Sequence, residues 1–189
     1  MILNEYKLSF QSDKKISPNF IILGNKYINS KSLIYKLNQN LEFNYNKSNF
    51  NLISNILNKQ KLIKTFIIHK TSNNLFTIRI KEKNIIGLTK IKNNDYLIDE
   101  LNNLIKFKVT PDLSHLPIFI GKNSNKGANI VLRLLKESDI DFNYISLTFI
   151  DNRRWNINLN NGVKILLPEI NILETLKLLK KINIEYNIL

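Results

Sequence analysis

The sequence predicts an α+β chain, in which a β-α-α-β-β unit is followed by a mixed β-sheet domain with two flanking helices. Three observations lead to this prediction. Apolar residues recur at helical spacing before Leu62 and at strand spacing after it. From Asn84 onward, short apolar runs are separated by turn residues. Asn160-Asn161-Gly162 then separates two strand-like runs, and Asn-Gly accepts the positive φ angles of a type I′ hairpin turn.

A chain of 189 residues with 43% hydrophobic content is long enough to bury one large core or two small ones. The β-α-α-β-β pattern occupies about 65–70 residues, which is within the size range of a small domain. We therefore expect a disordered lead-in, a first module and a second module, at residues 1–15, 16–86 and 87–189.

The first module is predicted to begin with a short strand at Asn19–Leu23, because Gly24-Asn25 is a turn signal. Ser30 suits the N-cap of a helix, since its hydroxyl can accept a hydrogen bond from an unpaired backbone N–H group. A second helix is predicted from about Asn49. Its apolar stripe consists of Phe50, Ile53 and Leu57.

The module is predicted to end in a hairpin formed by Leu62–Lys70 and Leu75–Glu82, with Ser72-Asn73-Asn74 as the turn. The second strand alternates, with Phe76, Ile78 and Ile80 on one face and Thr77, Arg79 and Lys81 on the other. This alternation is typical of a half-buried antiparallel hairpin.

The second module is predicted to contain several short strands and two helices. Strands are expected at Ile85–Ile91, Asp95–Ile98 and Leu104-Ile105. A connector containing Pro111 is expected at Thr110–Leu116, and an edge strand that ends in a turn at Leu116–Gly121. A helix is expected at Asn125–Ser138 with Ile130, Val131, Leu134 and Leu135 buried. A strand-like segment follows at Tyr144–Leu159, and its return strand, Val163–Leu167, is ended by Pro168. The last predicted element is an amphipathic helix that ends at about Ile182 and has Leu173, Leu176 and Leu179 on its apolar face.

The net charge of +13 and the pI near 9.8 raise nucleic acid or an anionic membrane surface as partners. Only four of the 28 basic residues are arginines, and the lysines are scattered along a chain that also over-uses Asn and Ile. Arginine is the residue that clamps phosphate bidentately, so this pattern favours a general drift in composition over a phosphate-binding patch. A basic RNA-binding protein remains the alternative interpretation.

The sequence carries little that points to catalysis. With no cysteine, a disulfide scaffold, a thiolate zinc site and a cysteine nucleophile are excluded. His69 and His115 lie far apart without a ligand-spaced partner, and no nucleophile elbow or phosphate-binding glycine loop occurs. We predict no catalytic residue, no metal and no cofactor, although acid–base sites need no local signature.

Arg153-Arg154-Trp155 differs from the rest of the chain, because two of the four arginines adjoin the single tryptophan. One interpretation places Trp155 in the core with Ile157 and Leu159, while the arginines lie at the rim. The other makes the three residues a protein-docking surface, because Arg and Trp dominate interface hot spots.

The segment Arg153–Glu169 resembles the Arg-Arg-Trp, Asn-Gly, Leu-Pro-Glu hairpin of the FtsQ/DivIB family of bacterial cell-division proteins, in particular of alphaproteobacterial members. Leu116–Gly121 is similar to the family's short Leu-Pro…Gly strand, and the β-α-α-β-β unit resembles its polypeptide-transport-associated (POTRA) domain. Ile80–Lys83 matches the family's Val-x-Glu-Arg strand end, and Leu97-Ile98-Asp99 matches its Leu-Ile-Asp…Gly turn. The resemblance runs in order from about Ile16 to Leu189.

Some features depart from the family pattern. Asn84-Ile85-Ile86 lacks the usual proline, and Asn102 replaces the turn glycine, which Asn can do because it tolerates a left-handed backbone. Family members also have a cytoplasmic segment and a transmembrane helix before this region, and one or two strands after the last helix. We expect that trimming or a misplaced gene boundary accounts for these parts, which this sequence does not contain.

The resemblance implies a non-catalytic, single-pass protein of the inner membrane with this part in the periplasm, linking early and late division proteins. The implied partners are divisome proteins, FtsB- and FtsL-like small coiled-coil membrane proteins, with no small-molecule substrate and no nucleic acid. The implied binding mode is β-augmentation, in which a partner strand pairs with an open sheet edge. By position, Arg153 and Arg154 match family arginines near that edge and, with Trp155, are the predicted partner-binding residues.

Overall fold

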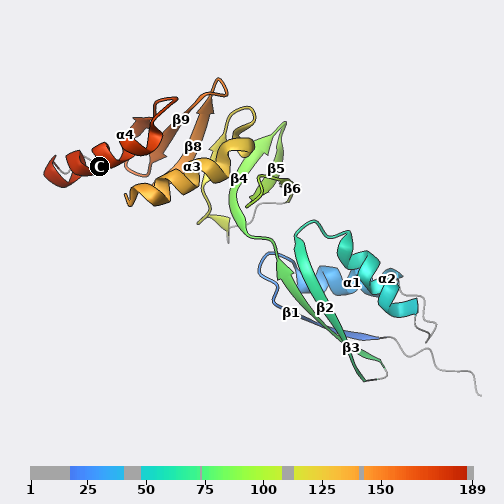
Figure 1. The fold of residues 1–189 in the computed structure, drawn as a ribbon. Helices are drawn as coiled ribbons and strands as arrows, with labels where there is room; N and C mark the ends of the chain where they lie inside the picture. Colours follow the sequence, from blue (N-terminus) through green and yellow to red (C-terminus); the bar gives the residue numbers. More distant parts are fainter. Residues whose placement is uncertain (1–17, 41–47, 73, 108–112, 141–142, 187–189) are drawn as a thin grey trace, which may run out of the picture. The chain divides into compact units, whose positions relative to one another are not determined.

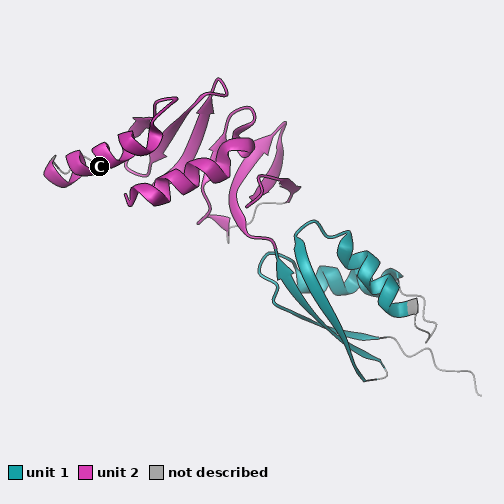
Figure 2. Cartoon of the chain, in the orientation of Figure 1, with its two compact units in different colours: residues 1–82 teal, residues 83–189 magenta. Residues whose placement is uncertain are grey.

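The computed structural model describes residues 18–40, 48–72, 74–107, 113–140 and 143–186. The chain forms two compact units, residues 1–82 and 83–189 (Figure 2). The sequence placed the boundary between the modules four residues later, after residue 86. The predicted lead-in at 1–15 and the first three residues of the connector, 110–112, lie outside the described residues.

Unit 1 has the element order β-α-α-β-β that the sequence predicts (Figure 1). Its elements are β1 (Asn19–Leu23), α1 (Ser30–Asn40), α2 (Ser48–Asn58), β2 (Ile63–Ser72) and β3 (Leu75–Glu82). The strands form a three-stranded sheet in the order β1-β3-β2. β1 is parallel to β3, and β2 is antiparallel to it, so the last strand lies in the centre.

The core of unit 1 forms where the apolar face of β3 meets the two helices. Phe76, Ile78 and Ile80 are buried, whereas Arg79 and Lys81 on the other face of β3 are exposed, which confirms the predicted alternation. The rest of the core comes from Phe20 on β1, Leu33 and Leu37 on α1, and Ile53 and Leu57 on α2. Burying a Leu, Ile or Phe side chain contributes about 1.5–3 kcal/mol each, so this cluster is the main source of stability in the unit.

The residue that caps α1 is Asn29 rather than the predicted Ser30. The side-chain oxygen of Asn29 accepts a hydrogen bond from the Ser32 N–H at 2.9 Å, which is the N-cap to N3 geometry. Ser30 instead accepts a hydrogen bond from the side chain of Asn25 at 3.0 Å. Both residue types are good caps, and the position of the preceding loop decides between them.

That loop is held by Glu82 at the end of β3. Its carboxylate accepts three hydrogen bonds from backbone N–H groups, those of Lys26 at 2.9 Å, Tyr27 at 2.8 Å and Ile28 at 2.8 Å. Charge-assisted hydrogen bonds of this kind are stronger than neutral ones. Glu82 therefore ties the last strand of unit 1 to the entry of its first helix.

Unit 2 consists of a seven-stranded mixed sheet and two helices (Figure 1). The elements are β4 (Ile85–Ile91), β5 (Asn94–Asp99), β6 (Leu104–Lys106), β7 (Ile118–Ile120), α3 (Ser124–Ser138), β8 (Tyr144–Ile150), β9 (Arg154–Leu159), β10 (Lys164–Leu166) and α4 (Ile172–Tyr186). The strand order is β10-β9-β8-β7-β4-β5-β6. The predicted α+β class is confirmed in both units.

The prediction that Leu116–Gly121 forms an edge strand is wrong. β7 lies in the middle of the sheet and is parallel to β4 on one side and to β8 on the other. Pro117 lies just before the strand, so its missing N–H does not interrupt the ladder, and its carbonyl accepts the Leu88 N–H at 2.9 Å. Gly87 permits this close approach, because a Cβ there would lie 2.3 Å from the Phe119 ring.

Helices α3 and α4 contribute to one core with the strands of the sheet. Its buried residues include Ala128, Val131 and Leu135 from α3, Leu176 from α4, and Phe119, Leu147, Trp155, Ile157 and Leu159 from the strands. Ile130, predicted to be buried, is 54% exposed. The buried face of α3 carries Ala128 rather than Ile130. Beside it, Gly127 faces the Trp155 ring, and a Cβ there would lie 3.1 Å from the indole.

The strand-like segment Tyr144–Leu159 is two antiparallel strands, β8 and β9, joined by a turn at Asp151–Arg153. The Asn-Gly hairpin between β9 and β10 is present, but its turn is not type I′. In the described loop, Gly162 alone has a positive φ, of 85°. The Gly162 N–H donates to the carbonyl of Leu159, and the Leu159 N–H donates to the carbonyl of Val163. A type I turn followed by a left-handed glycine gives this pattern.

Candidate functional site: the edge of the sheet at β10

The sheet of unit 2 ends at β10, which pairs only with β9 among the described residues. The N–H of Leu167 donates to Trp155 O at 2.9 Å, and the carbonyl of Val163 accepts the Leu159 N–H at 2.9 Å. Because backbone groups alternate in direction along an antiparallel strand, those of Lys164 and Leu166 point away from β9. This edge therefore offers unpaired donors and acceptors to a further strand.

The side chains of β10 leave the edge accessible. Lys164 and Leu166 are exposed, Leu166 at 59%, while Ile165 between them packs against the core. Pro168 lies two residues after the end of β10 and prevents the strand from extending. The result is a three-residue edge with one cationic and one apolar side chain beside its free backbone groups.

Arg153 and Arg154 lie at the end of this edge. Arg153 belongs to the β8–β9 turn and is exposed, and its guanidinium is 3.9 Å from a carboxylate oxygen of Glu169, the residue that follows Pro168. A contact of this length between exposed groups contributes little to stability. Arg154, the first residue of β9, is exposed and makes no ion pair with a described residue.

Trp155 lies in the core, as the packing interpretation predicts, and is only 5% exposed. Its ring stacks on Phe149 with centroids 4.6 Å apart and meets Phe119 edge-on at 5.8 Å. Ile157 and Leu159 are buried on the same face of β9. The indole is therefore not on the surface with the arginines, and the structure does not bring the three predicted residues together as one patch.

The opposite face of β8 and β9 carries a polar row that sequence reasoning missed. The side-chain amide of Asn158 donates to Ser146 at 2.8 Å and Thr148 at 3.2 Å, and the buried Oδ1 of Asn156 has no partner among the described residues. The signal was present in Trp155-Asn156-Ile157-Asn158-Leu159, because strict alternation of apolar residues with Asn marks a strand with two different faces.

Two segments that support the family resemblance also meet at the start of unit 2. The Lys83 ammonium lies 3.2 Å from Asp99 Oδ2, and the Asp99 carboxylate accepts hydrogen bonds from Leu101 and Asn103 as well. Burial tends to raise the pKa of Asp99, but the hydrogen bonds from Asn103, Lys83 and Leu101 outweigh it and hold the pKa below its ordinary value. Asn102 in this turn has a φ of 65°, the left-handed conformation expected of a glycine substitute.

The described residues hold little else that suggests chemistry. They contain no group of three His, Asp or Glu side chains able to hold a metal ion. His69 and His115 are both exposed and lie in different units. Across the same part of the chain, none of the helices has the length and hydrophobicity needed to cross a membrane.

Comparison with known proteins shows which family the chain resembles. Residues 87–188 match the family described as "Cell division protein FtsQ/DivIB, C-terminal". The chain is 28% identical over 184 residues to cell division protein FtsQ of Rickettsia typhi and to that of Rickettsia prowazekii, covering 97% of this chain and 68% of each relative.

Among solved structures, the chain is similar to the major extracytoplasmic domain of the division protein DivIB from Geobacillus stearothermophilus. The two chains share 12% sequence identity at a TM-score of 0.35, over 57% of this chain and 96% of the other. Since the family match spans residues 87–188, more than half of the 189 residues including the whole β10 edge, the chain belongs to the FtsQ/DivIB family of cell-division proteins.

Proposed function

We propose that this chain is a non-catalytic scaffold of the division machinery, which binds a partner protein by strand addition at the edge of β10. The observation that carries the proposal is the open edge itself, where Lys164 and Leu166 present unpaired backbone groups. A partner strand laid against this edge would extend the seven-stranded sheet.

The arginines supply the electrostatic part of the proposed contact. Arg154 is exposed and makes no ion pair with a described residue, so it can pair with a partner carboxylate without first breaking an internal bond. Arg153 is held only by the 3.9 Å contact to Glu169 and is available in the same way. Trp155 takes a positioning role, because its burial against Phe149 and Phe119 fixes the start of β9, from which Arg154 projects.

The partners that fit this mode are FtsB- and FtsL-like small coiled-coil proteins, whose segments outside the coiled coil can add a strand. The proposed location follows from the same assignment: unit 1 and unit 2 lie in the periplasm, next to an inner membrane into which a single-pass helix anchors the complete protein. No enzymatic activity is proposed, because the open edge and the exposed arginines provide binding groups and no reacting group.

The proposal is tested by removing one outward-facing N–H from the edge. Leu166→Pro deletes the backbone donor that points away from β9, whereas Leu166→Ala shortens the same side chain and keeps the donor. We expect the proline variant to bind an FtsB-like periplasmic peptide at least about tenfold more weakly than the alanine variant, the scale of a lost backbone hydrogen bond together with its steric clash. Isothermal titration calorimetry measures both affinities.

Two measurements keep the result unambiguous. Fluorescence of Trp155, the only tryptophan, reports whether unit 2 remains folded in each variant. Equal affinities of two folded variants would show that the partner does not pair with this strand, and the strand-addition proposal would then be abandoned.

A further inference from the structure

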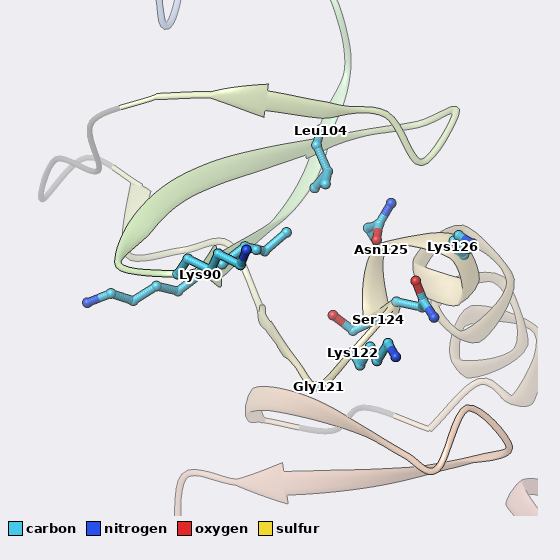
Figure 3. A pocket seen from close by; sticks show the side chains of 10 residues that line it. Lys90, Leu104, Gly121, Lys122, Ser124, Asn125 and Lys126 are labelled. Atoms are coloured by element: carbon cyan, nitrogen blue, oxygen red, sulfur yellow. The ribbon is translucent and has the colours of Figure 1, made fainter.

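A pocket of about 610 Å³ lies at the N-terminal end of α3 in unit 2 (Figure 3). It is lined by the end of β4 and the turn that follows, by Leu104 of β6, by the loop between β7 and α3, and by the first turn of α3. Four of the ten lining residues are lysines and none is acidic: Lys90, Lys92, Lys122 and Lys126. The lysines are scattered along the sequence, but the fold places these four around one pocket.

The four lysines form no ion pair within the described structure. Asp95, which is opposite Lys90 in the β4–β5 register, forms none with it. Like charges gathered in one concave site repel one another and raise the local potential. An anionic ligand would relieve that repulsion.

The backbone adds to the positive potential. α3 is a 15-residue helix, and its N-cap residue, Asn123, makes no side-chain capping hydrogen bond. The N-terminus of such a helix carries a partial positive charge that favours anions. The N–H groups of Ser124 and Lys126 already donate to the carbonyls of Gly121 and Asn123, so the attraction comes mainly from the helix dipole. The side chains of Asn123 and Asn125 hold this end in place through hydrogen bonds to Asn152 and to the carbonyl of Asn102, each of 3.0 Å.

Ser124 provides an independent indication of a ligand. It is 2% exposed and lines the pocket, yet its hydroxyl makes no hydrogen bond to any described residue. Figure 3 shows this hydroxyl on the pocket side of the helix end. Unlike the unpartnered Oδ1 of Asn156, the Ser124 hydroxyl is not completely buried, so a ligand in the pocket can take the place of the solvent that reaches it.

We propose that this pocket binds a phosphomonoester group. The helix end and the Ser124 hydroxyl would hold the phosphate oxygens, and the lysines would neutralise its two negative charges. The pocket is larger than a phosphate ion, and Ile91 and Leu104 form an apolar wall for the organic group that carries it. The inference does not depend on the β10 edge, so either proposal can fail without the other.

The test uses ¹⁵N chemical shifts of the whole chain during titration with phenyl phosphate, with inorganic phosphate, and with phosphatidylcholine vesicles that contain or lack phosphatidic acid. We expect saturable shifts at Ser124, Asn125 and Lys126 with phenyl phosphate. If the phosphate group that the pocket binds belongs to a lipid, vesicles with phosphatidic acid will bind more tightly than phenyl phosphate. If the group belongs to a soluble molecule, these vesicles will bind no more tightly than phenyl phosphate. Either outcome supports the phosphate site.

Variants separate a built site from general charge attraction. Ser124→Ala should weaken phenyl phosphate binding about tenfold, the scale of one hydrogen bond to a charged group, and leave the stability of unit 2 unchanged or higher. Lys122→Glu combined with Lys126→Glu should abolish binding, whereas Lys177→Glu, an exposed lysine on α4, should not.

Three results would overturn the proposal. The first is the absence of saturable binding, and the second is unchanged binding in Ser124→Ala. The third is binding of polyuridylate, with steep salt dependence, by a protein that does not bind phenyl phosphate, because that would indicate an RNA-binding surface instead.

Discussion

The ammonium group of Lys83 and the carboxylate of Asp99 form an ion pair of 3.2 Å across 16 residues of sequence. Asp99 is almost completely buried, and its other hydrogen bonds come from the Leu101 N–H and from the backbone and side chain of Asn103. The first residue of unit 2 is thereby tied to the β5–β6 turn. The carboxylate organises the turn through its local bonds to Leu101 and Asn103, and the contact to Lys83 joins that turn to the start of the unit.

Asp99→Asn should destabilise unit 2 by about 2–3 kcal/mol, because the amide would turn a donor toward Lys83 and the Asn103 side chain. Chemical denaturation followed by Trp155 fluorescence measures this loss. Lys90→Met, which removes an exposed lysine from β4 without breaking an ion pair, is the control and should change stability by less than about 0.5 kcal/mol.

The same carboxylate should make the stability of unit 2 depend on pH. The pKa of Asp99 in the folded protein is below its ordinary value of 3.8, so the contribution of the ionised form is present above that pH and is lost as pH falls through the lower, folded pKa. The stability difference between the wild type and Asp99→Asn should therefore be constant from about pH 5 to 7 and shrink below about pH 4. A difference that stays constant down to pH 2 would contradict this assignment.

Glu82→Gln should destabilise unit 1 by about 1–2 kcal/mol, because the charge and one of the acceptors for the backbone of Lys26, Tyr27 and Ile28 are lost. Hydrogen exchange measures the effect directly, and the amides of Tyr27 and Ile28 should exchange faster. Glu137→Gln, on the exposed surface of α3, is a charge-matched control that should leave these amides unchanged.

Gly121→Ala should cost more stability than Gly162→Ala, although both glycines have a positive φ. At Gly121 a Cβ would lie 2.3 Å from the carbonyl oxygen of Phe149, whereas at Gly162 nothing lies within 4 Å. The Gly162 variant should lose about 1–2 kcal/mol from backbone strain alone. A larger loss at Gly121, measured by denaturation, would isolate the cost of the steric contact, and equal losses would show that the loop can move away.

Trp155→Ala should destabilise unit 2 by about 3–5 kcal/mol, because it removes a buried aromatic ring packed between Phe149 and Phe119. Thermal unfolding followed by circular dichroism measures it, since the only tryptophan is lost. Trp155→Phe should recover much of the stability, because a smaller cavity remains. A fully stable alanine variant would mean that the ring is not a core residue.

Arg154→Glu should weaken binding of an FtsB-like partner by tenfold or more while changing stability by less than about 0.5 kcal/mol, because the side chain is exposed. Arg133→Glu on α3 carries the same charge change away from the edge and is the matched control. Calorimetry with one partner peptide measures both. Equal affinity in the two variants would remove Arg154 from the proposed contact.

Element types and strand faces followed from local patterns in this chain. The alternation of β3, the two helices of unit 1 and the hairpin at Gly162 are each visible over a few residues, because side-chain direction depends on the backbone period. The family resemblance rested on the same kind of local signal, in Arg153–Glu169 and Ile80–Lys83.

Properties that depend on non-local partners could not be derived in this way. The central position of β7, the buried face of α3 with Ala128 in place of Ile130, and the choice of Asn29 over Ser30 as a cap all follow from what the rest of the fold places beside these residues. The convergence of Lys90, Lys92, Lys122 and Lys126 has the same origin. Periodicity along the chain sets which side a residue faces, but the identity of its neighbour there is decided only when strands and helices pack.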